Sequence, residues 1–155
     1  MDELKSSFLF EASIQLSEPL AIGAGPEGFR AIYHVTEGNF SGPRMKGRYL
    51  PSGGEWARIR SDGSLAIDVR CVLETDDGAL IYMTYGGRIV VPAEIQAQVM
   101  DMTASERPDP SAYYFRVAPL FETASPEYAW LNGVQAVGVG QIIQGGVAYK
   151  FYAID

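Results

Sequence analysis

Apolar and polar residues alternate with a period of two along most of the chain, the pattern of strands with one buried face. In residues 8–16 every second side chain is apolar, and Pro19 ends the strand that this pattern predicts. Further strands are predicted at residues 31–35, 40–50, 113–122, 128–132, 135–139 and 147–152. The pattern therefore favours an all-β protein.

The centre of the chain carries the clearest signal. Apolar runs at 56–60, 65–74 and 79–85 are separated by Asp62-Gly63 and by Asp77-Gly78. An Asp-Gly pair between alternating runs predicts a tight hairpin, because glycine tolerates the positive φ that such turns need. These three runs are predicted to form a meander.

Pro92 opens a short stretch rich in Ala, Glu, Gln and Met, which predicts one short helix over residues 92–102. Eight to ten short strands with one helix favour a closed antiparallel β-barrel, because closure removes exposed strand edges. An open sandwich is the alternative. The length of 155 residues and the absence of a linker or repeat indicate one domain over residues 1–155.

Two-residue loops at both Asp-Gly pairs would place Asp68, Arg70 and Tyr85 on one face of the meander. This mixed face also carries Ala57, Ile59, Val72, Glu74, Ile81 and Met83, and it suits the lumen of a barrel with a ligand cavity. The opposite face is almost wholly apolar and resembles a plain core: Trp56, Leu65, Ile67, Val69, Cys71, Leu73, Leu80 and Tyr82. The alternative is that the mixed face is solvated, with surface ion pairs. A loop longer by one residue would change the register.

The composition excludes several classes of function. A net charge of −7 argues against a nucleic-acid partner, and no apolar run is long enough for a membrane helix. A single cysteine and the lack of a signal-peptide pattern indicate the cytoplasm. With His34 as the only histidine, a His/Cys zinc site is excluded, and no phosphate-binding loop or serine-nucleophile motif stands in a suitable setting. We therefore expect no metal and no cofactor.

The chain resembles a bacterial and fungal family known as domain of unknown function 3237. The resemblance runs from Arg30 to about Tyr152, and the segments that carry it are Gly38-Asn39-Phe40-Ser41-Gly42-Pro43, Leu50-Pro51-Ser52-Gly53-Gly54-Glu55-Trp56, Arg60-Ser61-Asp62-Gly63, Asp68-Val69-Arg70, Thr75-Asp76-Asp77-Gly78-Ala79, Tyr114-Phe115-Arg116, Pro119-Leu120-Phe121-Glu122-Thr123 and Tyr128-Ala129-Trp130-Leu131-Asn132. It implies a barrel like that of lipocalins or allene oxide cyclase, assembled as a homo-oligomer, and it implies no activity. Departures fall at His34, Glu37 and Glu55, where the family usually has Pro, Gly and Asp.

Our first functional hypothesis is a cofactor-independent lyase or isomerase acting on a small aromatic compound. Arg70 and Arg116 would stabilise a phenolate or enolate, and Asp68 or Glu122 would move a proton. The expected ligand-binding residues are Arg30, His34, Tyr85, Tyr114, Trp130 and Asn132. A carrier barrel without turnover and a purely structural oligomer are the alternatives, and the state of the lumen distinguishes all three.

Overall fold

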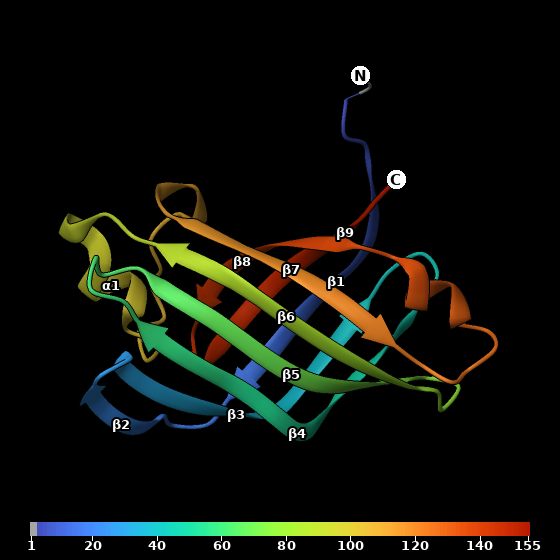
Figure 1. Cartoon of the computed structure of the whole chain (residues 1–155), viewed down its shortest axis with the longest axis horizontal. Coiled ribbons are helices and arrows are strands. Elements are labelled where there is room, and N and C mark those ends of the chain that lie inside the picture. The colour runs from blue at the N-terminus through green and yellow to red at the C-terminus, as the bar shows by residue number, and fades with distance from the viewer. Residues whose placement is uncertain (1–2) are drawn as a thin grey trace.

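The computed structural model describes residues 3–155, and nine strands follow one another within them (Figure 1). The strands are β1 (Ser6–Leu16), β2 (Leu20–Gly25), β3 (Gly28–Ser41), β4 (Lys46–Ile59), β5 (Leu65–Thr75), β6 (Leu80–Val90), β7 (Tyr114–Glu122), β8 (Ala136–Ile143) and β9 (Gly146–Ile154). All strand pairings are antiparallel.

Eight of these strands close into a barrel, as the alternation predicted. The order around the wall is β1-β9-β8-β7-β6-β5-β4-β3, and the second half of β3 pairs with β1 to complete the circle. The ninth strand, β2, pairs with the first half of β3 instead. Closure supplies hydrogen-bond partners to strand edges that an open sheet would expose.

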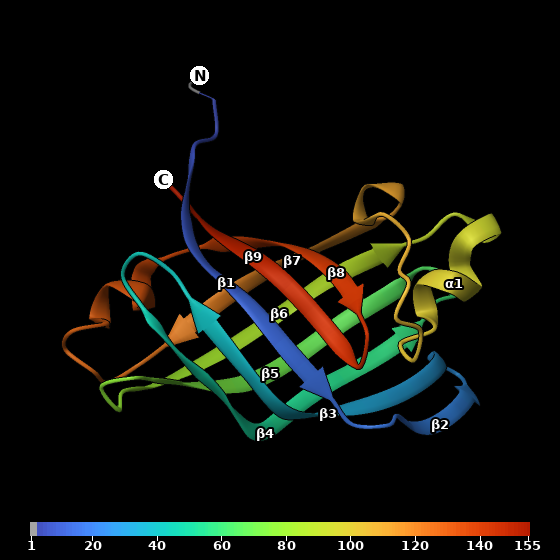
Figure 2. The same cartoon turned by 180° about the vertical axis from the view of Figure 1, so that it is seen from behind.

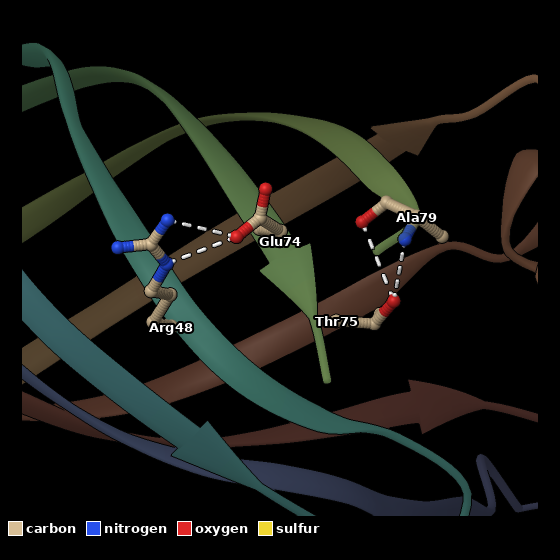
Figure 3. Close-up of polar contacts among 4 residues, drawn as sticks. All are labelled: Arg48, Glu74, Thr75 and Ala79. Atoms are coloured by element: carbon tan, nitrogen blue, oxygen red, sulfur yellow. Dashed lines mark hydrogen bonds and ion pairs between the residues drawn. The ribbon is translucent and has the colours of Figure 1, made fainter. Parts of the chain in front are cut away.

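Both central hairpins have loops one residue longer than predicted. Glu74 pairs with Leu80, and the Thr75 N–H donates to the Ala79 carbonyl at 2.9 Å, which leaves a loop of Asp76, Asp77 and Gly78. The Thr75 hydroxyl accepts a further bond from the Ala79 N–H at 2.9 Å (Figure 3). Gly78 has a φ of 89°, as expected for the last residue of a three-residue loop.

The first hairpin follows the same rule. The Arg60 N–H donates to the Ser64 carbonyl, and Gly63, with a φ of 83°, ends a three-residue loop. One added residue in each loop shifts each pairing by one position, so Cys71 lies opposite Met83 rather than opposite Thr84. The predicted cross-strand partners were therefore wrong. The shift matters because side chains alternate between faces at every residue, so one position changes which side chains of two strands share a face.

The barrel is filled at one end by aromatic rings. Phe10 packs against Phe40, Phe121 and Phe151 with ring centroids 4.9–6.3 Å apart, and Met83 is fully buried in the same core cluster. The short helix η3 (Ala129–Gly133) lies beside this end. Residues 128–132 were predicted to form a strand, and that prediction was wrong.

The other end carries the segment between β6 and β7. It contains η1 (Ala93–Ile95), α1 (Gln96–Met100) and η2 (Pro110–Ala112), so the predicted helix near residues 92–102 is present but broken (Figures 1 and 2). Within residues 3–155, none of the helices has the length and apolar character that spanning a bilayer requires.

Candidate active site

A cavity lies inside the barrel at the end where α1 sits. Its volume is about 60 Å³. The wall is mostly apolar and comes from all eight barrel strands, with two methionines from the segment around α1. It is lined by Ile14, Leu16, Tyr33, Val35, Tyr49, Gly54, Glu55, Ala57, Leu65, Ile67, Val69, Cys71, Tyr85, Ile89, Met100, Met102, Phe115, Ile142, Val147 and Tyr149.

Glu55 is the single carboxylate that residues 3–155 contribute to this wall. It stands on β4, opposite Tyr33 of β3 on one side and Val69 of β5 on the other, and only 9% of its surface is exposed. Within the described residues, neither carboxylate oxygen has a hydrogen-bond partner. A buried polar group without partners is costly, and such groups are concentrated at functional sites.

Burial raises the pKa of the Glu55 carboxyl from 4.5 to about 8. The Asp68 backbone N–H and the positive charge of Arg30 lower this pKa in part, and the negative charge of Asp68 raises it. Neither Asp68 nor Arg30 makes a hydrogen bond of good geometry to the carboxylate oxygens. With a pKa of about 8, about nine-tenths of the Glu55 side chains carry a proton at pH 7.

The backbone before Glu55 explains how an acid comes to face inward. The register between β4 and β5 shifts between Tyr49 and Gly53, where β4 carries extra residues. Gly53 has a φ of 77°, and a Cβ there would lie 2.0 Å from the Arg70 carbonyl oxygen, so the position requires glycine. Beyond this irregularity β4 pairs regularly again, with Glu55 and Ala57 both inside.

Tyrosine side chains line the same cavity as the carboxyl. Tyr149 packs edge-to-face against Tyr85 and Phe115, with centroids 5.6 and 5.3 Å away. Burial, followed by the charge of Glu55, raises the pKa of both Tyr149 and Tyr33, so these phenols stay protonated near neutral pH. They can therefore donate hydrogen bonds to an oxygen atom of a ligand.

The charge of the cavity is equally informative. Among the described residues, no lysine or arginine lines it, and no group of three or more His, Cys, Asp or Glu side chains is placed to hold a metal ion. A ligand anion would therefore meet no cation inside. The arrangement suits a neutral ligand and proton transfer by Glu55.

Asp68, Arg70, Arg116 and Glu122, the predicted catalytic residues, are all exposed on the outer wall of the barrel. The prediction that Asp68, Arg70 and Arg116 point into one cavity was wrong. Closure of the barrel buries the apolar set Leu65, Ile67, Val69, Cys71 and Leu73 on the inner face of β5, and the one-residue register shift places Tyr85 on that face, opposite Val69. Arg70 instead lies 5.7 Å from the Trp56 ring centroid, and Arg116 lies 5.0 Å from that of Tyr114.

Of the predicted ligand-binding residues, Tyr85 lines the cavity and its contact with a ligand stays a prediction. The others lie outside the cavity. Arg30 donates to the Trp56 carbonyl at 2.9 Å, and His34 and Tyr114 are exposed. In η3, the ring centroid of Trp130 lies 3.6 Å from the guanidinium carbon of Arg44. The Asn132 side-chain amide is hydrogen-bonded to the backbone of Thr123.

Residue-level reasoning missed Glu55, Tyr33 and Tyr149. Two signals could have located Glu55. It follows Gly53-Gly54, a break in a strand, and it shares its parity with Ala57 and Ile59, which were placed on the lumen face. The family resemblance, in which this position usually carries Asp, marks the same place.

The eight-stranded antiparallel wall, and the unpaired carboxyl that residues 3–155 place in its apolar interior, define the class: a small β-barrel with an internal cavity. The chain belongs to the family described as "Protein of unknown function (DUF3237)", whose sequence model matches residues 4–154. The resemblance seen in the sequence is thereby confirmed.

Three relatives place the chain more closely. A UPF0311 protein of Clostridium acetobutylicum is 33% identical, over 99% of this chain and 96% of its own. The crystal structure of a beta-barrel like protein from Acinetobacter baumannii superposes with a TM-score of 0.85 at 34% identity, over 100% of this chain and 98% of that one. A hydroalkoxylation enzyme of Penicillium herquei is 27% identical over 84% of this chain and 70% of its own. At least one distant relative is therefore an enzyme.

Proposed function

We propose that this protein is a lyase or isomerase that uses no cofactor and acts on a small, neutral aromatic compound held in the barrel cavity. The observation that carries the proposal is Glu55: a buried carboxyl that has no hydrogen-bond partner among residues 3–155, with a pKa of about 8, in a mostly apolar cavity. A side chain that is mostly protonated at neutral pH and faces a cavity is suited to general acid catalysis.

The proposed step is a proton-initiated ring closure or its reverse. The Glu55 carboxylic acid gives its proton to one carbon of a carbon–carbon double bond. A hydroxyl oxygen of the same molecule forms a bond to the other carbon, and the hydroxyl proton passes to the Glu55 carboxylate. The product is an isomer of the substrate, and the acid is regenerated.

In this proposal tyrosine side chains, rather than arginine side chains, orient the substrate. Because Arg70 and Arg116 lie on the outer wall, none of the described residues supplies the cavity with a cation to hold a phenolate or enolate. The hydroxyls of Tyr149 and Tyr85 would instead donate hydrogen bonds to a neutral oxygen, and their ring edges would pack against an aromatic ring. The hydroalkoxylation enzyme of Penicillium herquei supports this direction, since hydroalkoxylation adds an O–H group across a double bond.

The test is turnover of 2-allylphenol-type compounds, followed by chromatography and NMR for formation of the cyclic ether. Glu55→Gln keeps the shape of the side chain but cannot lose or gain a proton near neutral pH, so it should reduce the rate at least 100-fold. Glu122→Gln, on the outer wall of β7, is the matched control and should keep full activity. The rate should fall as the pH rises through about 8, where Glu55 loses its proton. Full activity in Glu55→Gln would overturn the proposal.

A carrier without turnover is the second candidate, favoured by the apolar wall. It predicts that aromatic compounds bind and are released unchanged, with affinity largely preserved in Glu55→Gln. Binding measured by calorimetry next to turnover in the same two proteins separates the candidates.

A further inference from the structure

The end of the cavity beside α1 is covered by two methionines. Met100 is the last residue of α1 and Met102 follows two positions later, and both line the cavity. Val99, which directly precedes Met100 in α1, is fully buried. In Figures 1 and 2 this segment crosses the end of the barrel opposite to η3. The remaining lining residues stand on barrel strands.

Hydrogen bonds attach the covering segment to the barrel near the β8–β9 turn. The Arg107 guanidinium donates to the carbonyl oxygens of Val99 and Asp101 within the segment, and to that of Ile142 at the end of β8 at 3.3 Å. The Gly145 N–H donates to the Met102 carbonyl at 2.8 Å, and the Gln144 amide donates to the Thr103 carbonyl at 3.1 Å. Bonds from the β8–β9 turn therefore hold the methionines over the cavity.

We propose that Met100 and Met102 determine the largest ligand that the cavity admits, with Arg107 as the positioning residue that holds them in place. The inference rests on the proposed function only in taking the Glu55 cavity as the ligand site. The strand residues of a closed barrel are fixed by hydrogen bonds on both sides, whereas methionine is unbranched and adapts its shape. The adjustable part of the wall is therefore this pair.

The volume gives the size limit. The cavity volume of about 60 Å³ is smaller than the roughly 150 Å³ of an apolar cavity that holds benzene, so even one aromatic ring requires the methionines to adjust and two fused rings require more space than the wall leaves. Replacing methionine with alanine removes three heavy atoms from the wall. Either change should therefore open the site to two-ring compounds.

Calorimetric titration with 4-fluorophenol and with 6-fluoro-2-naphthol, backed by fluorine NMR, tests this without any need for turnover. In the natural protein the one-ring probe should bind at least 10-fold more tightly. Met100→Ala or Met102→Ala should bring the two affinities to within about 3-fold. Met45→Ala is the matched control: Met45 is buried but does not line the cavity, so the ratio should stay unchanged.

Arg107→Gln should raise both the binding and release rates of the one-ring probe at least 5-fold, measured by fluorine line shapes, and Arg107→Lys should restore part of the difference. A ratio of affinities that does not change in either methionine variant would overturn the inference. Failure of both probes to bind any of these proteins would also overturn it. Size selection by the methionines without turnover of any substrate would support this inference and count against the proposed function alone.

Discussion

Glu55 should make the stability of the protein fall as the pH rises, and Glu55→Gln should remove that dependence. The folded pKa of about 8 lies above the value of 4.5 for an exposed glutamate, so the folded state holds a proton that the unfolded state releases. The contribution of this proton to the free energy of unfolding is fully present below pH 4.5 and is lost as the pH rises towards about 8.

The size of the effect follows from the same two values. At about 1.36 kcal/mol per pH unit, linkage predicts that the natural protein loses about 4 kcal/mol of unfolding free energy, relative to Glu55→Gln, between pH 5 and pH 9. About 2.5 kcal/mol of this loss should occur between pH 5 and pH 7. Other titrating groups contribute equally to both proteins and cancel in the difference.

Urea unfolding of both proteins at five pH values from 5 to 9, followed by tryptophan fluorescence, measures this difference. Glu122→Gln, on the outer wall, controls for the loss of one negative charge. If the difference between the natural protein and Glu55→Gln stays within about 0.5 kcal/mol across this range, the carboxyl is not held in the protonated form by burial. The assignment of Glu55 as a proton donor would then fail with it.

Three further results are expected. Arg70→Met should bind aromatic probes as the natural protein does and change the unfolding free energy by less than about 0.5 kcal/mol, because Arg70 is an exposed outer-wall residue; loss of binding would return it to the site. Gly53→Ala should lower the unfolding free energy by at least about 2 kcal/mol in urea titrations, because of its positive φ and the Arg70 carbonyl, whereas Gly63→Ala, where nothing lies near the added methyl, should cost about 1 kcal/mol; equal costs would contradict the steric argument. Cys71, whose pKa burial raises to about 12, should react with a disulfide reagent only as fast as the protein unfolds, and rapid labelling of the folded protein would show that the cavity is more open than described.

The alternation of apolar and polar residues determined much of the fold. Period-two runs and the Asp-Gly pairs at Asp62-Gly63 and Asp77-Gly78 predicted antiparallel hairpins, and the number of strands predicted closure. These signals are local, since they depend on how neighbouring side chains alternate and on the φ that a turn residue must adopt. The family was visible in the sequence for the same reason, through short contiguous segments.

Which face of each strand turns inward was decided only in three dimensions. Asp-Gly suits both a two-residue and a three-residue loop, and the choice between them shifts every cross-strand partner beyond the turn by one position. Both faces of the meander carried enough apolar side chains to fill a lumen, so hydrophobicity did not select one. Closure of the barrel did: it buried Leu65 to Leu73 on alternate positions and left Asp68 and Arg70 in water.

The position of Glu55 has a similar cause. The irregular pairing of β4 at Gly53 and the long-range pairing with Tyr33 and Val69 bring its carboxyl inside, where burial raises its pKa. In the sequence Glu55 is one of 19 acidic residues, and an acid is expected at the surface because burying an unpaired carboxylate is costly. The exception arises from tertiary contacts that no local pattern encodes.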